Sequence, residues 1–270
     1  MKTNTFMLRN LFFKNYCSKK VKILFLLLFM NIFFLQIISA KAFFDYPIST
    51  VFIDAGHGGM DSGAVASYDF NPLIEEKDIV LEVALGVEKY LNKALSDIDV
   101  VQIRDDDTYY TLQERSEFAY KYPLKDKSSS IFVSIHANSA SSNSAKGFEI
   151  FTKLEKKQVD LFDEETPVEN IDLFVNERFE VLSEQQYQTS YQLAQQIENE
   201  FKNDFPQLRD RGIKSDDLYV LNVCRTTGCL IEIGFLSNED EAKLLTDSVY
   251  LNNISKTIAD GIIDYIKKRR

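Results

Sequence analysis

The chain has 270 residues with 41 acidic side chains against 31 lysines and arginines, so its formal net charge at pH 7 is −10. Residues 1–42 hold seven of the basic residues and no acidic one, which leaves residues 43–270 with a net charge of −17. Such a surface repels nucleic acid and anionic membrane faces, so we predict no nucleic-acid partner. It also gives no general attraction for an anionic polymer.

Residues 1–42 have the pattern of a secretory signal peptide. Basic residues precede an apolar run of 18 residues at 23–40, and Ala40 and Ala42 stand at the positions that a signal peptidase reads. We predict export, with cleavage after Ala42. If the signal stays uncleaved, it is the one membrane contact that the sequence predicts, because its apolar run is near the lower limit for a spanning helix.

Residues 43–270 alternate between short apolar runs and helical patterns, as expected for a single domain. We predict strands at 51–56, 100–104, 130–137, 147–152, 218–223 and 229–235. We predict helices at 76–95, 111–121, 187–204, 238–247 and 252–268. Strands that alternate with helices indicate an α/β fold, with a mostly parallel twisted sheet of about six strands and helices on both faces.

An acidic segment, residues 153–186, interrupts this alternation. It holds ten acidic residues against four basic ones, together with large apolar residues such as Phe162 and Phe174. Two interpretations stay open. One is a surface insertion with one short helix, and the other is a segment that docks on the rest of the protein.

Two cysteines follow the signal region, Cys224 and Cys229, in the stretch CRTTGC. In an oxidising compartment they form a disulfide only if their Cα atoms lie within about 4.4–6.8 Å. The sequence leaves both a disulfide and two buried thiols open.

The chain holds only two histidines, and both are expected at the carboxyl end of a strand. His57 follows the strand at 51–56 in the glycine-rich stretch GHGGMDSG, and His136 lies near the end of the strand at 130–137. In open α/β sheets, ligands bind at this edge. Two imidazoles that meet there favour a metal, and zinc suits them if a carboxylate is the third ligand and the fourth position is left open for water.

The third ligand is expected from a nearby helix start, where Glu75 and Glu76 are the candidates. Either one can instead stabilise the positive end of the helix at 76–95. Glu232 lies between two isoleucines in a strand that is otherwise apolar. An unpaired carboxylate in a core costs several kcal/mol, so a glutamate here indicates a functional cleft and a general base.

Other chemistries fit the sequence less well. The glycines after the first strand do not have the GxGxxG spacing, and no P-loop Lys-Ser/Thr pair is present. We interpret them as allowing positive φ angles beside the metal, with Asp54 accepting backbone N–H bonds around them. Ser134 and His136 suggest a serine nucleophile, but no nucleophile-elbow sequence surrounds them.

Seven stretches occur in an order that resembles the zinc-dependent N-acetylmuramoyl-L-alanine amidases of the type 3 family. They are VFIDAGHGGMDSGA, EKDIVL, LQERSEFA, IFVSIHANS, GFEIF, RGIK…LYVL and CLIEIGFLSNEDEAKLL. The resemblance as a whole extends from about Val51 to Ile266, apart from 153–186. The resemblance implies an exported bacterial enzyme of the periplasm or cell envelope. Its reaction would be hydrolysis of the amide between N-acetylmuramic acid and L-alanine of peptidoglycan, for wall remodelling or daughter-cell separation.

The resemblance also implies roles for individual residues. It implies one zinc ion with His57, Glu76 and His136 as ligands, which favours Glu76 over Glu75, and it implies Glu232 as the catalytic residue. Arg115 matches a recurrent arginine that we expect to be structural. The stretch TTGC at 226–229 departs from a Pro-Ala pair frequent in relatives, which affects the expected loop beside the site but not the zinc.

The position of 153–186 suggests regulation. In relatives from Gram-negative bacteria, an insertion at this point forms a helix that covers the zinc until an activator protein displaces it. We therefore hypothesise that 153–186 is autoinhibitory. Two other functions stay open: a zinc peptidase that acts within the stem peptides of peptidoglycan, and a non-catalytic wall-associated regulator that kept the fold.

Overall fold

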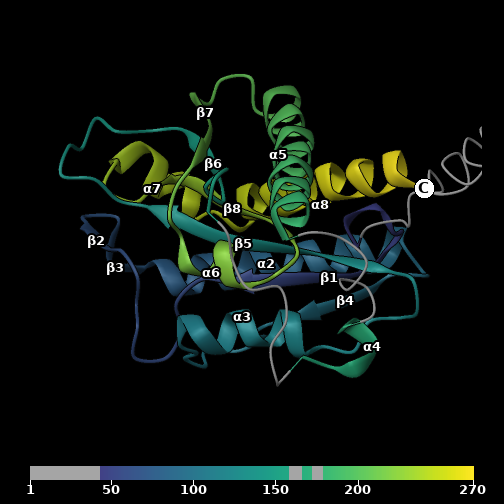
Figure 1. Ribbon diagram of the computed structural model, residues 1–270. Coiled ribbons are helices and arrows are strands. Elements are labelled where there is room, and N and C mark those ends of the chain that lie inside the picture. Colours follow the sequence, from purple (N-terminus) through teal and green to yellow (C-terminus); the bar gives the residue numbers. More distant parts are fainter. Residues whose placement is uncertain (1–42, 158–165, 172–178) are drawn as a thin grey trace, which may run out of the picture. The chain divides into compact units, whose positions relative to one another are not determined.

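The computed structural model describes residues 43–157, 166–171 and 179–270, and the predicted signal segment 1–42 lies outside the described residues. Six strands form one sheet in the order β4-β1-β5-β8-β6-β7 (Figure 1). All neighbouring strands are parallel except β6 and β8. The strands are β1 (Ile48–Ala55), β4 (Asp99–Gln102), β5 (Ser129–Asn138), β6 (Phe148–Thr152), β7 (Asp210–Ser215) and β8 (Thr227–Phe235). The predicted mostly parallel sheet is confirmed.

Helices cover both faces of this sheet, as predicted. The helices are η1 (Phe43–Asp45), α2 (Glu76–Ala94), α3 (Leu112–Lys121), α4 (Val168–Ile171), α5 (Phe179–Asp204), α6 (Tyr219–Val223), α7 (Glu239–Leu245) and α8 (Ser248–Arg269). Helices α2, α5 and α8 pack on one face, where the larger apolar core lies. Helices α3 and α6 pack together over the other face and enclose a smaller core (Figure 1).

The central strands are apolar along their length because both of their faces are covered. Successive residues alternate between the two cores: Ile53 and Val133 point into the larger core, whereas Phe52 and Phe132 point into the smaller one. The polar residues that interrupt this pattern lie on the side of α3 and α6. That side of the sheet therefore holds the chemistry.

One predicted strand is wrong, one strand was not predicted, and the start of α5 needs correction. Residues 219–223 of the predicted strand at 218–223 form α6 instead. So short a run has no periodicity that separates helix from strand, and its packing on α3 decides its conformation. The sixth strand is instead β7, whose polar sequence DRGIKS suits an edge strand. Helix α5 begins at Phe179 rather than 187, so the last part of the acidic segment is helical.

A hairpin that the sequence did not predict connects the first loop to α2. Its strands are β2 (Val65–Tyr68) and β3 (Asn71–Glu75), which pair antiparallel. The hairpin ends directly before Glu76, and so it delivers that residue to the start of α2. Cys224 and Cys229 are both buried free thiols, which decides between the two alternatives for this pair.

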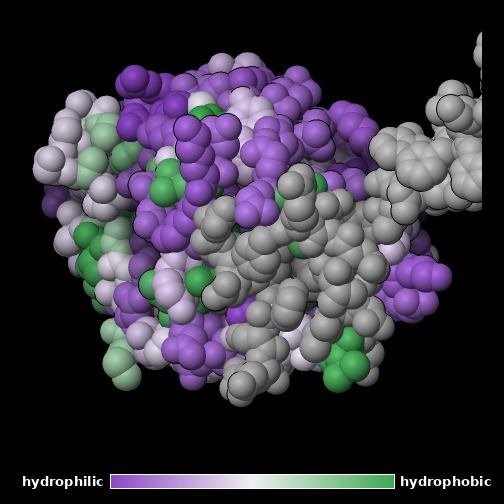
Figure 2. Space-filling model, viewed as in Figure 1, coloured by the Kyte–Doolittle hydropathy of each residue, from purple (hydrophilic) through white to green (hydrophobic). Residues whose placement is uncertain are grey.

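The surface agrees with the composition. Hydrophilic residues predominate on the face in Figure 2, and hydrophobic ones are scattered in small groups. Among the described residues, no helix is long and apolar enough to cross a membrane.

Candidate metal centre

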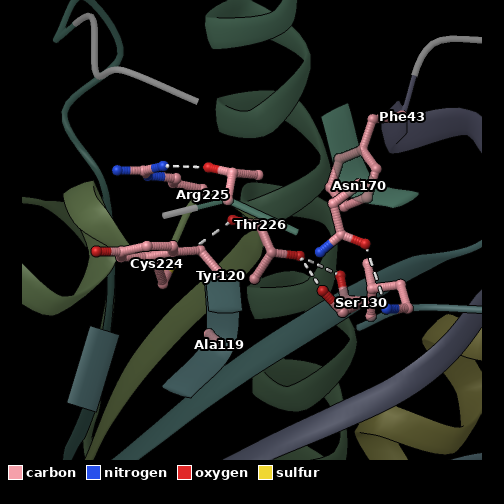
Figure 3. Close-up of a pocket in the computed structure, with 10 residues that line it drawn as sticks. Phe43, Ala119, Tyr120, Ser130, Asn170, Cys224, Arg225 and Thr226 are labelled. Carbon is pink, nitrogen blue, oxygen red and sulfur yellow. Dashed lines mark hydrogen bonds between the residues drawn. The ribbon is translucent and has the colours of Figure 1, made fainter. Parts of the chain in front are cut away.

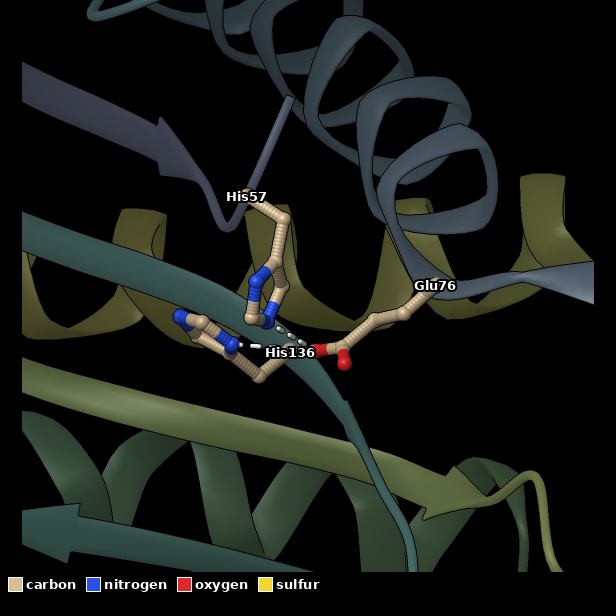
Figure 4. A group of neighbouring side chains, drawn as sticks. All are labelled: His57, Glu76 and His136. Carbon is tan, nitrogen blue, oxygen red and sulfur yellow. Dashed lines mark hydrogen bonds and ion pairs between the residues drawn. The ribbon is translucent and has the colours of Figure 1, made fainter. Parts of the chain in front are cut away.

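Three side chains from separate elements meet at the carboxyl ends of the central strands (Figure 4). His57 follows β1, His136 lies near the end of β5, and Glu76 is the first residue of α2. One oxygen of Glu76, Oε1, lies 3.1 Å from His57 Nε2 and 3.0 Å from His136 Nδ1. The sequence predicted this cluster, and the structure brings Glu76 rather than Glu75 to the two histidines.

The backbone around His57 is shaped for close approach. His57 itself has φ 60°, a left-handed conformation that non-glycine residues seldom adopt. A Cβ atom on Gly56 would lie 2.3 Å from the His136 ring, and one on Gly63 would lie 2.5 Å from Glu76 Oε2. These two positions must be glycine, because any side chain would displace a member of the cluster.

Two buried arginines hold this loop from behind. Arg115 donates to the backbone oxygens of Ala55 and His57 and to the carboxylate of Asp54, at 2.6 Å in the last case. Arg104 donates to the backbone oxygens of Ala55 and Gly56 at 2.9 and 2.7 Å. The structural role expected for Arg115 is thus seen in its contacts, and Arg104 shares it.

The sequence suggested that the carboxylate of Asp54 accepts backbone N–H bonds around the glycines, but in the structure it does not. It accepts bonds from Arg115 and from the Ser134 hydroxyl, at 2.6 and 2.7 Å. Ser134 is therefore tied to Asp54, which agrees with the rejection of a serine nucleophile. Asp54 is buried under the loop, where its carboxylate pairs with Arg115 instead of with backbone N–H groups.

Asp61, which the sequence reasoning did not single out, completes the surroundings of His57. Its Oδ2 lies 2.9 Å from His57 Nδ1, which leaves Nε2 directed at Glu76. A carboxylate on the far nitrogen is the usual support of a metal-binding histidine. The spacing of four residues within the glycine loop was the available signal, and it is weak in a chain with 41 acidic residues.

The ionisation states of Glu76 and His57 depend on the charged and polar groups around them. Burial opposes ionisation of Glu76, but hydrogen bonds and charge from His136 and His57 outweigh it and hold the pKa of Glu76 far below its usual range. Burial likewise opposes protonation of His57, yet Glu76 and Asp61 raise the pKa of His57 overall. The site therefore presents an anionic oxygen between two ring nitrogens, an arrangement that attracts a cation.

Glu232 lies next to this cluster on β8. It is the register partner of His136 on the adjacent strand, so both side chains are on the same face of the sheet. Burial raises the pKa of Glu232 to about 7. No hydrogen-bond partner reaches its Oε2 among the described residues. A buried carboxylate oxygen without a partner is costly and calls for an explanation, such as a bound ion or a catalytic role.

The donor set fits a zinc ion. One ligand atom from each of His57, Glu76 and His136 lies within 4.8 Å of the others. Ligands about 2.0–2.1 Å from a tetrahedral zinc are roughly 3.4 Å apart, close to the separations seen here. A cavity of about 300 Å³ opens onto the cluster, with Glu232, Tyr109 and Tyr219 among its lining residues. Two imidazoles, one carboxylate and a free carboxylate at the edge of a parallel sheet are typical of metal-dependent hydrolases.

Comparison with known proteins narrows this class to one family. Residues 51–264 match the family model described as N-acetylmuramoyl-L-alanine amidase. The chain is 31% identical over 224 residues to the N-acetylmuramoyl-L-alanine amidase LytC of Bacillus subtilis, covering 81% of this chain and 36% of LytC. It thus spans about a third of the length of that relative.

Solved structures give the same result. The catalytic domain of the amidase CwlV from Paenibacillus polymyxa has a TM-score of 0.62 and 30% identity, covering 82% of this chain and 99% of that domain. The CwlD amidase of Clostridioides difficile, solved in complex with the GerS lipoprotein, has a TM-score of 0.60 and 28% identity, covering 82% and 99%. The chain belongs to the N-acetylmuramoyl-L-alanine amidase family, hydrolases that cleave the amide between N-acetylmuramic acid and L-alanine of peptidoglycan.

Proposed function

We propose that this chain hydrolyses the amide between N-acetylmuramic acid and L-alanine with one zinc ion held by His57, Glu76 and His136. The observation that supports this most strongly is the free Oε2 of Glu232 beside three convergent ligand atoms. A structural ion pair would leave no such oxygen unpaired in a buried position.

Zinc, when bound, would lower the pKa of an attacking water and polarise the scissile carbonyl. In the proposed reaction, Glu232 Oε2 takes a proton from the attacking water and delivers it to the leaving nitrogen of L-alanine. Burial of the Glu232 carboxylate favours such a role, because it raises the pKa of this group and so makes it a stronger base than an exposed glutamate. Asp61 keeps the His57 ring oriented, and Arg115 keeps the loop in place.

Glu232→Gln tests this assignment. The variant should lose about 10²–10⁴-fold in rate, the usual contribution of a general base, while it still binds one zinc per chain. Metal content by atomic absorption and dye release from labelled peptidoglycan measure the two effects. Loss of zinc in the variant would make Glu232 a ligand and contradict the assignment. Unchanged dye release in the zinc-loaded variant would remove Glu232 from the mechanism.

Two other functions predict different products from the same peptidoglycan. A stem-peptide peptidase would release peptide fragments and leave L-alanine attached to the sugar. A non-catalytic wall-associated regulator would release no dye with any metal. The presence of all four proposed side chains in one cluster favours the enzyme.

Export through a cleaved signal at 1–42 is part of the proposal. Phe43 and Phe44, directly after the expected cleavage position, are buried in the domain at 2% and 1% exposure, which fits a mature chain that starts near them. N-terminal sequencing of protein recovered from the envelope of the producing cells tests this. A mature protein that begins at Met1 would contradict cleavage.

Autoinhibition by the acidic segment 153–186 remains a proposal, with displacement by an activator protein. Support comes from its acidic composition and from the CwlD–GerS complex, in which an amidase of similar fold is bound by a lipoprotein. The described part of the segment docks elsewhere: Asn170 bonds the backbone of Tyr122 and Leu124, and Thr166 accepts from Arg225. Figure 3 shows Asn170 and Arg225 among the residues that line a pocket there. Residues 158–165 and 172–178 lie outside the described residues.

A deletion of 158–178 with a short glycine-serine linker tests autoinhibition, because it leaves α5 intact. Autoinhibition predicts faster dye release from peptidoglycan by the deleted protein. Equal or slower release by a protein with an unchanged melting temperature would favour an inert insertion.

A further inference from the structure

A row of polar side chains continues from the candidate metal centre to the edge of the sheet. Glu149 on β6 is the register partner of Glu232 on β8, so both lie on the face of α3 and α6. The carboxylate of Glu149 accepts bonds from Asn138 Nδ2 at 2.6 Å, from Arg211 Nε at 2.7 Å and from Lys214 Nζ. Arg211 and Lys214 belong to β7, the edge strand.

A bulge in β7 brings both cations to the same face. Between Phe148 and Ile150 of β6 the chain advances two residues, while their partners Asp210 and Ile213 of β7 are three apart. The extra residue turns the Arg211 side chain to the face that Lys214 already occupies, since alternation would otherwise separate them. Gly212 within the bulge has φ 82°, and a Cβ there would meet nothing within 4 Å. Glycine is therefore needed for the backbone turn and not for space.

Counted by ion pairs, the charges at this edge do not cancel, although the buried carboxylate of Glu241 also interacts with the charge of Arg211. Two cations face one carboxylate, and the Glu149 side chain is only 4% exposed, whereas those of Arg211 and Lys214 are 25% and 40% exposed. Within the described residues, the terminal nitrogens of Arg211 have no hydrogen-bond partner. The guanidinium lies 4.8 Å from the Phe235 ring centroid, and the Lys214 ammonium lies 5.5 Å from that of Phe151, which holds both in place.

A surplus of positive charge is unusual on a domain with a net charge of −17. It lies two strands away from Glu232, or about 10 Å at the usual strand spacing. An extended peptide advances about 3.3–3.6 Å per residue, so this distance corresponds to two or three residues beyond the scissile amide.

We propose that Arg211 and Lys214 form a subsite for a carboxylate of the peptide stem, on the second or third residue after the cleaved bond. This rests on the proposed function, and it assigns to the stem a path from the metal centre toward β7. Arginine and lysine on one anchoring glutamate give a fixed fork and a point charge for a carboxylate, and Glu149 keeps them from collapsing onto Glu232. The cavity itself, whose lining includes Tyr109 and Tyr219, is then left for the sugar.

The test uses pairs of synthetic muramyl tripeptides that differ only by a carboxylate or carboxamide on the second residue, or on the third. We expect the wild type to prefer the carboxylate form of at least one pair through a lower KM. Arg211→Gln and Lys214→Gln should each raise that KM roughly fivefold and the double variant more, with kcat and the carboxamide KM little changed. Lys256→Gln, an exposed lysine on α8, is the matched control.

Glu149→Gln should change the affinity for the carboxylate stem in the opposite direction. Removing its negative charge while both cations remain should tighten binding of the carboxylate stem, measured by calorimetry with the free tripeptide and chelated protein. If Arg211 and Lys214 only neutralise Glu149, the variants change kcat on both substrates alike and leave the carboxylate preference intact, which would overturn the proposal. If neither substrate is hydrolysed by the wild type, the proposed function fails, while calorimetry still decides the subsite.

Discussion

The two ends of the central strands differ in how their polar groups are satisfied. At the amino ends, buried hydroxyls bond one another: Ser130 Oγ lies 2.9 Å from Thr226 Oγ1, and Thr227 donates to Thr189 at 2.7 Å. At the carboxyl ends, His57 holds a left-handed backbone and Glu232 keeps an unpaired oxygen. Left-handed backbone also occurs before the amino ends, at Lys127 and Arg225. The carboxyl ends differ in gathering ionisable side chains, one of which keeps an unpaired oxygen, as expected of a reactive site.

The largest expected effect comes from removing the shared carboxylate. Glu76→Gln should reduce zinc affinity by more than about a hundredfold, because even residues that only support a ligand account for 10–100-fold, and hydrolysis should fall to background. Glu75→Gln is the matched control, since it changes the neighbouring carboxylate outside the cluster. Zinc titration and dye release measure both. Equal losses in the two variants would contradict the assignment of Glu76.

A smaller effect is expected from a single methyl group. Gly63→Ala places a Cβ 2.5 Å from Glu76 Oε2 on a backbone with φ 66°, so the carboxylate or the loop must move. We expect at least a tenfold loss of kcat/KM and a destabilisation of about 1–3 kcal/mol from the backbone alone. Steady-state kinetics and urea unfolding report the two separately. Full activity in this variant would show that the close approach is not required.

Glu232 makes a prediction that concerns stability rather than turnover. Burial raises its pKa from 4.5 to about 7, so the folded state holds the proton more tightly than the unfolded chain. The penalty for an ionised Glu232 therefore appears as pH rises from about 4.5 and is complete above about 7. In zinc-free protein, Glu232→Gln should raise the free energy of unfolding, and this gain should be about 2 kcal/mol larger at pH 8 than at pH 5. A gain that is the same at both values would mean that Glu232 is not buried as described.

The amino ends supply the smallest effect and the contrast. Thr226→Val removes the hydroxyl that bonds Ser130 and should cost about 1–2 kcal/mol of unfolding free energy. Its kcat and KM should equal those of the wild type, because these bonds lie at the far ends of the strands. The expectation that residues 226–229 affect a loop beside the site is thus wrong, since they lie at the amino end of β8. A change in kcat without a change in stability would contradict the separate roles of the two ends.

Much of this site was predictable because its signals were rare. Only two histidines occur in 270 residues, so their positions at two strand ends carried information. Glu232 stood out because an ionisable residue in an apolar strand has few structural explanations. Of the helices with clear periodicity, α2 was placed to within one residue at each end, whereas the prediction for α8 missed its first turn.

Other features left no local signal. The segment 218–223 has strand-like residues but folds as α6, since packing on α3 overrides propensity in a short run. The edge strand β7 is polar, and its role is set by pairing with β6. Asp61 and Arg104 act through contacts that only the folded loop creates. Composition gave no means to select them from many charged residues.

The most direct test of the account is mass analysis of the products released from defined muropeptides, with and without a zinc chelator. We predict free stem peptides that begin with an unmodified L-alanine amine, together with peptide-free N-acetylmuramic acid. In the presence of the chelator, no products should form until zinc is restored. Products cut within the stem, with L-alanine still attached to the sugar, or undiminished cleavage in zinc-free protein, would contradict it.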